Sequence, residues 1–196
     1  MITIYGDPGS GNCLKVKWTA EHLGIPFTWK DIDVTRAETR TPAFLAMNPA
    51  GQVPTVVLDD GRPLAQSNAI ILHLAEGSPL IPTDHYVRAK MLEWMFWEQY
   101  SHEPAIAVAR FQMKYLGKRR DELDPKLIDR GEAALARLEQ GLTGDYLVGG
   151  RVSLADISLV AYTRTAGDGG FNLSAYPAIR AWVARVEAAI PIRDPA

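Results

Sequence analysis

The spacing of hydrophobic and polar positions changes near Gly77. Before it, the short runs ITIY and PFTWKDIDV predict strands, and VPTVVLDDGRPLA predicts a hairpin that turns at Asp60–Gly61. Between these strands we expect a helix over residues 10–23, a short helix in TPAFLAMNPAG that Thr41 caps, and a helix from Ser67 to Gly77. The predicted order is βαβαββα, which is typical of an α/β domain.

The remainder of the chain has helical spacing throughout. The stretch DHYVRAKMLEWMFWEQYSHEPAIAVARFQMKYL should be kinked or divided at Pro104, because proline removes a helical hydrogen bond. Asp124 caps the next helix, Ser153 and Asp156 form a capping box at a third, and YPAIRAWVARVEAAI is the last. We therefore predict an α/β domain over 1–77, a linker over 78–84 and an all-α helical domain over 85–196.

Composition narrows the class of protein. The 21 basic and 23 acidic residues are nearly balanced, so we expect no nucleic-acid partner. A single cysteine cannot form an internal disulfide, which favours a reducing compartment. The strand-like start MITIY does not resemble a signal peptide, and no apolar run is long enough to span a membrane. These features predict a cytoplasmic globular protein without a membrane partner.

The loop YGDPGSGNC leads into the first predicted helix and contains the only cysteine, Cys13. A loop at this place in a βαβαββα domain resembles the thioredoxin superfamily, where the helix start stabilises a thiolate. The C-x-x-C pair of a dithiol redox protein is missing, which excludes dithiol exchange. The helix start could still activate one thiol, either that of Cys13 or that of a ligand.

Two further segments indicate that the thiol belongs to a ligand. GQVPT places Pro54 at the entry to a strand, and in the superfamily this proline is cis, so that the backbone before it can pair with a peptide. LAQSNAIILHL places Gln66 and Ser67 at a helix start, where a hydroxyl and backbone amides can hold a carboxylate. The two segments together describe a site for a small peptide.

These segments, with YLVGGRVSLADISLVAY in the helical half, closely resemble the cytosolic glutathione S-transferase family over essentially the whole chain. The resemblance implies a thioredoxin-like first domain that binds glutathione as co-substrate, a helical domain that contributes the site for a hydrophobic electrophile, a homodimer, no metal, and a role in detoxification. It also implies that Val53, with Pro54 after it, binds the cysteinyl part of glutathione, that Gln66 and Ser67 bind the γ-glutamyl end, and that Gln52 lies near the glycyl or cysteinyl part.

The catalytic position is less clearly marked. SGNCLKV is similar to the Thr/Ser-x-Asn-x-x-Lys-Val pattern of bacterial, theta-like or nu-like members, which makes Ser10 and Asn12 the candidates to stabilise the glutathione thiolate. Tyr5 and Cys13 are the weaker candidates, since Tyr5 fits a packed strand residue and Cys13 a small buried hydrophobic one. Ser10 could also serve only as a helix cap.

Two alternatives to transfer remain open. One is glutathione-dependent reduction of peroxides or disulfides, and the other is a non-catalytic interaction module with the same fold. Tyr100 and Arg110 are candidate walls of the acceptor site, whose electrophile the sequence does not identify. Glu98 and His102 are four residues apart, and we expect a surface pair rather than part of a metal site.

Overall fold

The computed structural model describes residues 1–192. The chain divides into two compact units. The first is formed by Met1–Ser78 together with the described residues after Ala189, and the second is Pro79–Ala189. The last four residues of the predicted helical domain lie outside the described residues.

The first unit contains a mixed four-stranded sheet in the order β2-β1-β3-β4. β1 (Ile2–Gly6) pairs in parallel with β2 (Phe27–Asp31) and antiparallel with β3 (Thr55–Val57), which pairs antiparallel with β4 (Pro63–Ala65). Burial alternates along β1, as expected for a strand with one face in the core. With α1 (Gly11–His22) and α2 (Pro42–Met47) between the strands and α3 (Ser67–Leu74) after them, this order confirms the predicted thioredoxin-like α/β domain.

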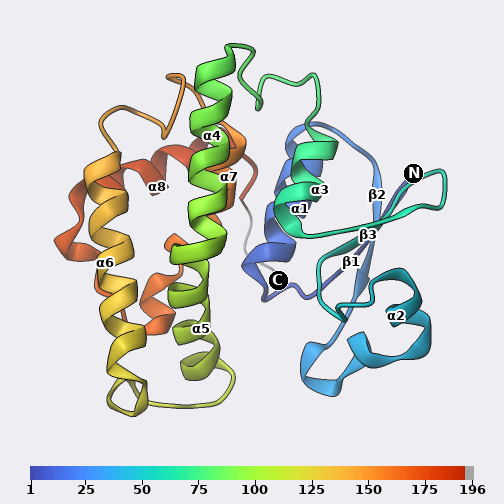
Figure 1. Cartoon of the computed structure of the whole chain (residues 1–196), viewed down its shortest axis with the longest axis horizontal. Helices are drawn as coiled ribbons and strands as arrows, with labels where there is room; N and C mark the ends of the chain where they lie inside the picture. Colours follow the sequence, from blue (N-terminus) through green and yellow to red (C-terminus); the bar gives the residue numbers. More distant parts are fainter. Residues whose placement is uncertain (193–196) are drawn as a thin grey trace. The chain divides into compact units, whose positions relative to one another are not determined.

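The helices lie on both sides of this sheet. α1 (Gly11–His22) and α3 (Ser67–Leu74) lie together on one side, and α2 (Pro42–Met47) lies on the other (Figure 1). Thr41 caps α2 as predicted, since its hydroxyl accepts the backbone amide of Phe44 at 3.3 Å. α3 begins at Ser67 as predicted, but it ends at Leu74, three residues before Gly77. The apolar residues of α1, α3 and the central strands form the core of the unit, which includes Ile4, Val16, Val56, Ile70 and Ile71.

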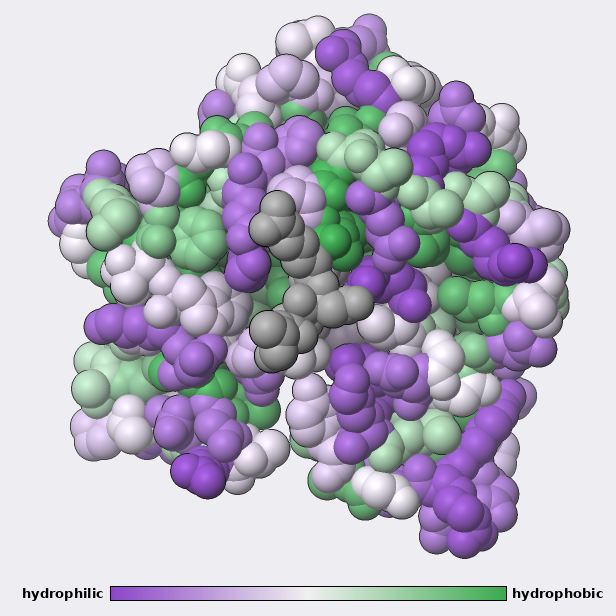
Figure 2. All heavy atoms as spheres, turned by 180° about the vertical axis from the view of Figure 1, so that it is seen from behind, coloured by the Kyte–Doolittle hydropathy of each residue, from purple (hydrophilic) through white to green (hydrophobic). Residues whose placement is uncertain are grey.

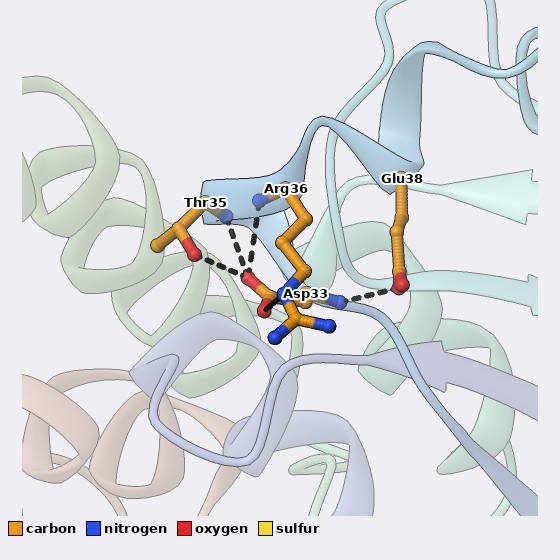
Figure 3. A network of polar contacts seen from close by, with 4 residues as sticks. All are labelled: Asp33, Thr35, Arg36 and Glu38. Carbon is orange, nitrogen blue, oxygen red and sulfur yellow. Dashed lines mark hydrogen bonds and ion pairs between the residues drawn. The ribbon is translucent and has the colours of Figure 1, made fainter.

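Two short 3₁₀ segments, Val34–Arg36 and Glu38–Arg40, connect β2 to α2. Figure 3 shows the contacts that shape this connection: Asp33 Oδ1 accepts the Thr35 amide at 2.8 Å, the Thr35 hydroxyl at 2.6 Å and the Arg36 amide at 3.2 Å. Glu38 Oε2 accepts the Asp33 amide at 2.7 Å. The hydrogen bond from the Thr35 hydroxyl is the largest cause of a lowered pKa at Asp33. The connection thus carries its own polar network.

The second unit is helical. α4 (His85–Trp97), a π-helical turn (Glu98–His102) and α5 (Glu103–Lys114) follow one another without a break, and α6 (Pro125–Gly141), α7 (Leu154–Thr163) and α8 (Pro177–Ala189) complete it, with short 3₁₀ turns at Arg120–Glu122, Ala166–Gly169 and Leu173–Ala175. Pro104 lies in the first turn of α5, and the π-helical turn directly before it interrupts the regular α-helix near the proline without ending it.

The capping box at α7 is present as predicted, and it extends into the core. Asp156 accepts the Ser153 amide at 2.9 Å and the Ser153 hydroxyl at 2.8 Å. It also accepts the Leu147 amide at 3.0 Å and the indole N–H of Trp182 at 2.8 Å. Burial raises the pKa of Asp156, and the four donors oppose that rise. One carboxylate therefore joins the segment before α7, α7 itself and α8.

The surface pair predicted for Glu98 and His102 is wrong. Both side chains are fully buried, because the π-helical turn directs them toward α7. Ser158 donates to Glu98 Oε2 at 3.2 Å, and the Thr163 hydroxyl lies 3.0 Å from His102 Nε2. The i,i+4 rule for exposed pairs assumes a regular α-helix, which this segment is not.

Residues 79–84 of the predicted linker group with the helical unit. Leu80 is buried, and its carbonyl accepts the Leu154 amide at 3.1 Å. On the face of the molecule that Figure 2 shows, hydrophilic and hydrophobic residues alternate in small areas. Within residues 1–192, no helix is both long and apolar enough to cross a membrane.

Candidate functional site

The loop before α1 is held by short polar contacts. Asp7 Oδ1 accepts the Gly9 amide at 2.7 Å, and the Asp7 carbonyl accepts the Ser10 amide at 3.0 Å. Ser10 has an extended backbone and occupies the N-cap position of α1, but its side chain makes no capping hydrogen bond. The half-buried Ser10 hydroxyl instead hydrogen-bonds to the Cys13 thiol. Because a hydroxyl hydrogen can rotate to another acceptor, Ser10 can turn from Cys13 to donate to a ligand at the helix start.

Cys13 lies on the inner side of α1 and is fully buried. Its sulfur accepts the Asp7 amide at 3.4 Å. Burial nevertheless raises the pKa of the thiol from 9.0 to about 12, which outweighs the hydrogen bonds from Ser10 and Asp7. A thiol in this state is neutral at physiological pH and is a poor nucleophile. The geometry therefore favours the reading of Cys13 as a packed core residue.

Asn12 lies where α1 and α3 meet. Its Oδ1 accepts the Ser67 hydroxyl at 3.1 Å and the Lys15 ammonium at 2.8 Å. Lys15 is fully buried, which is rare for a lysine and requires polar partners. The structure thus brings Asn12 and Ser67, which the sequence separates by 55 positions, into direct contact.

The start of α3 has an unusual backbone. Gln66 is exposed and has φ 71° and ψ 111°, a conformation that costs a non-glycine residue about 1–3 kcal/mol. Ser67 follows it as the first residue of α3 and is largely buried. Backbone amides at a helix start favour a carboxylate. The amides can therefore hold the carboxylate of an amino-acid head group while the exposed side chain of Gln66 contacts its ammonium group.

The Gln52–Pro54 segment lies just before β3. The Val53–Pro54 peptide is cis, as the resemblance implied. The ladder between β1 and β3 ends at Thr55, so Val53 lies beyond the paired part of the strand. The buried Asn48 fixes the segment, because its Nδ2 donates to the Gln52 carbonyl at 2.8 Å and to the Thr55 hydroxyl at 3.1 Å.

The side chain of Tyr5 contacts residues of α2 and β2. Its ring packs edge-on against Phe44 of α2, with ring centroids 6.3 Å apart, and the Lys30 ammonium lies 5.1 Å from the centre of the Tyr5 ring. Lys30 also donates to the Tyr5 hydroxyl at 3.4 Å. These contacts associate Tyr5 with β2 and α2, whereas Ser10, Asn12 and Ser67 gather where α1 meets α3.

The two candidates in the helical unit have different surroundings. Tyr100 is 84% exposed and lines a cavity of about 620 Å³ together with Trp97, Arg130 and Arg137. Arg110 is mostly buried, and its Nε donates to Asp168 at 3.1 Å. Tyr100 is therefore free to contact a ligand, while Arg110 holds the 166–169 turn.

Sequence reasoning missed three residues that shape the first unit. Lys15 contacts Asn12, Asn48 holds the segment before Pro54, and the exposed Arg40 donates to the Ala50 carbonyl at 3.3 Å. Of these, only Lys15 left a signal, because it is the lysine of the Thr/Ser-x-Asn-x-x-Lys-Val pattern, although that pattern indicates neither its burial nor its contact with Asn12. Within residues 1–192, no group of three or more acidic, histidine or cysteine side chains could hold a metal ion.

Together, these residues suit a small anionic peptide with a thiol. The start of α3 can hold a carboxylate, the backbone beside Pro54 can pair with an extended peptide, and the start of α1 offers the hydroxyl of Ser10 and the amide of Asn12. A hydroxyl donor and an amide donor at a helix start stabilise a thiolate rather than a thiol.

Comparison with known proteins agrees with this geometry. A glutathione S-transferase from Pseudomonas fluorescens Pf-5 is 48% identical, with a TM-score of 0.92 over 95% of this chain and 94% of that one. A glutathione transferase homologue from Sulfitobacter, solved with bound glutathione, is 26% identical, with a TM-score of 0.82 over 96% of this chain and 93% of that one. Glutathione S-transferase D7 from Drosophila melanogaster is 27% identical over 188 residues, which are 93% of this chain and 82% of that protein.

Family models match both units of the chain. The glutathione S-transferase N-terminal domain matches residues 9–76, and the C-terminal domain of the same family matches residues 95–189. The chain belongs to the glutathione S-transferase family.

Proposed function

We infer that this chain is a glutathione S-transferase that binds glutathione on its first unit and lowers the pKa of the bound thiol. The thiolate then attacks an electrophilic carbon of a hydrophobic substrate, and the new C–S bond of the thioether replaces the bond to a leaving group, which departs with its electron pair. One observation carries the inference: the hydrogen bond between Ser67 Oγ and Asn12 Oδ1 joins the start of α3, which suits a carboxylate, to the start of α1, which suits a thiolate. Glutathione contains both groups.

We propose the following contacts within this site. The γ-glutamyl carboxylate lies at the amides of α3 beside Ser67, and the Gln66 carbonyl accepts its ammonium group. The cysteinyl backbone pairs with Val53 next to Pro54, while Gln52 and the exposed Arg40 lie toward the glycyl carboxylate. Ser10 and Asn12 donate to the sulfur.

Cys13 and Tyr5 have weaker support as catalytic groups. The raised pKa and full burial of Cys13 speak against a mixed disulfide with glutathione, and the Tyr5 ring packs against Phe44 and Lys30 rather than against Asn12 or Ser67. A peroxidase or reductase mechanism that uses Cys13 would require the thiol to become accessible. A mechanism that uses the thiol of bound glutathione does not require Cys13 to become accessible.

The test measures the pKa of the bound thiol from thiolate absorbance as the pH is raised, after calorimetry has established binding. Cys13→Ala serves as the background, because it leaves glutathione as the only thiol. Adding Ser10→Ala should raise the pKa by about two units, equivalent to roughly 2.7 kcal/mol of lost thiolate stabilisation. The exposed Ser174 provides the control variant Ser174→Ala, which should change nothing.

Other outcomes would identify the alternatives. A chain that releases no binding heat with glutathione would be an interaction module with this fold. A glutathione adduct on Cys13 after incubation with oxidised glutathione would favour disulfide reduction. An unchanged thiol pKa in the Ser10→Ala variant would remove Ser10 from the mechanism.

We also propose that the helical unit supplies the acceptor site. Tyr100 is exposed beside a cavity and can stack on an aromatic electrophile, while Arg110 acts indirectly through its ion pair with Asp168. Conjugation of such electrophiles would make detoxification the role of the protein. Tyr100→Ala should then raise KM for the electrophile without changing KM for glutathione.

Two proposals concern the protein as a whole. We propose a homodimer, because Phe96 exposes a large aromatic surface on α4. We propose a cytoplasmic location, because the single cysteine is a free thiol that needs no oxidising compartment.

A further inference from the structure

Lys15 is a fully buried lysine of α1 that contacts Asn12, and the mechanism above gives it no role. Burying an ammonium group is costly, so a lysine seldom occupies such a position without a partner. A methionine of similar shape would fill the same space without that cost. Packing alone therefore does not explain why a charged residue stands at position 15.

The contacts of Lys15 determine which way the Asn12 amide faces. The Lys15 ammonium has donors only, and it lies 2.8 Å from Asn12 Oδ1. The Ser67 hydroxyl donates to the same oxygen at 3.1 Å. Turning the amide over would place its NH₂ group against the ammonium and the Ser67 hydroxyl, so both donors would lose Oδ1 as their acceptor. The Nδ2 side of the Asn12 amide therefore faces away from Lys15, and an N–H group is the donor that a thiolate requires.

We propose that Lys15 is a positioning residue for thiol activation: it fixes the amide of Asn12 as a donor to the glutathione sulfur and supplies a buried positive charge that favours the thiolate. This inference rests on the proposed function. A cation in a water-poor environment acts strongly on a neighbouring anion, because little solvent screens it. The same charge already lowers the pKa of the nearby Cys13 thiol, although burial outweighs it there.

The first test uses Lys15→Met in the Cys13→Ala background. Methionine keeps the length of the side chain and removes the charge and the donor. The pKa of the bound glutathione thiol should rise by about one unit or more, which is a tenfold loss of thiolate near neutral pH. The dissociation constant of glutathione should change by less than about threefold, since the contacts at α3 and Val53 remain.

Lys17 offers a matched control on the same helix. It lies nearer the surface and forms an ion pair with Glu21 at 2.6 Å. Lys17→Met should leave the thiol pKa at the wild-type value. The inference is overturned if the Lys15→Met and Lys17→Met variants have the same thiol pKa.

A double-mutant cycle separates positioning from packing. If Lys15 acts through the Asn12 amide, then the effect of Lys15→Met on the thiol pKa should fall to less than half in an Asn12→Ala background. A full effect in that background overturns positioning through Asn12. A purely structural role of Lys15 would lower the melting temperature and leave the thiol pKa unchanged.

Lys15→Gln covers the case in which Lys15→Met does not fold. Glutamine keeps a donor and lacks the charge, so the thiol pKa should again rise above the wild-type value. A folded Lys15→Gln variant with the wild-type pKa overturns the inference. If the wild-type protein does not bind glutathione, the proposed function and this inference fail together, whereas unchanged Lys15 variants of a protein that does bind it refute the inference alone.

Discussion

The thiol of Cys13 lies in the first turn of α1, where the dipole of a helix would favour a thiolate. The surroundings have the opposite effect, because burial raises the pKa of Cys13 to about 12. Helix position alone therefore does not activate a thiol. Access to water and to donors decides the outcome, and both are better for a ligand bound outside the helix than for a side chain beneath it.

We predict that iodoacetamide alkylates Cys13 slowly in the folded protein. At pH 8 a thiol with a pKa near 12 should react about a thousandfold more slowly than one at its ordinary value of 9.0, because the thiolate is the nucleophile. The rate should keep rising with pH beyond pH 9, where an ordinary thiol levels off. Intact mass after timed alkylation gives the rate, and the urea-unfolded protein is the control. Rapid labelling of the folded protein at pH 8 would contradict the burial of Cys13.

The sequence indicates the local structure around some candidate residues better than that around others. Gln66 and Ser67 stand at a helix start and Pro54 at a strand entry, so their local structure could be predicted. The surroundings of Lys15 could not, because they depend on the contact of Asn12 with Ser67 between α1 and α3. Spacing along one helix does not reveal which polar groups a second helix will bring.

At the scale of elements, Asp156 joins three segments of the helical unit. Each of its two oxygens accepts two donors: Oδ1 accepts from Leu147 and Trp182, and Oδ2 accepts twice from Ser153. Because all four contacts donate to Asp156, a side chain that itself donates cannot replace it without losing some of them. Asp156 thus contributes to folding rather than to chemistry, as its place in a capping box indicated.

We therefore predict that Asp156→Asn destabilises the protein. Whichever way the new amide turns, its NH₂ group faces two donors, and the cost should be about 3 kcal/mol. The midpoint of urea unfolding measures the effect. Asp129→Asn, at an exposed position of α6, should shift the midpoint little. Equal midpoints for the two variants would show that the network around Asp156 carries little free energy.

Gly131 in α6 gives a prediction in which two effects compete. Alanine favours a helix over glycine by about 1 kcal/mol. However, a Cβ at Gly131 would collide with the ring of Phe171, and overpacking a core costs about 1–3 kcal/mol. Gly131→Ala should therefore lower the melting temperature. Gly167→Ala, which has no atom within 4 Å of the added carbon, should be nearly neutral.

The elements themselves show where sequence rules work. Thr41, Asp124 and Ser153 all cap the helices for which they were predicted, because capping depends on residues three positions apart or fewer. The 3₁₀ segments after β2 and the π-helical turn before α5 were not predicted. The 3₁₀ segments depend on the polar network around Asp33, and the π-helical turn depends on contacts with α7. The periodicity of apolar residues describes neither.

At the scale of the whole molecule, the proposed homodimer leads to a prediction. Phe96 is 72% exposed, and Phe96→Glu would place a charge in an apolar contact between two copies. Light scattering should then show the mass of one chain, where the wild type shows that of two. Leu116→Glu, at a 58% exposed position after α5, should remain dimeric. A monomeric wild-type protein would rule out the dimer proposal.

The π-helical turn has a consequence for the length of this helix. Residues 98–102 contain one residue more than an α-helical path would need. Deleting Gln99 would let α4 and α5 run on as a single regular helix with little rotation of one against the other, because the deletion removes the residue that the π-helical turn accommodates. Ala105, Ile106 and Ala109 would then still face the core. The contacts of Glu98 and His102 with α7 depend on the turn itself and would be disturbed. Homologues that are one residue shorter here can therefore keep the face that α5 turns inward.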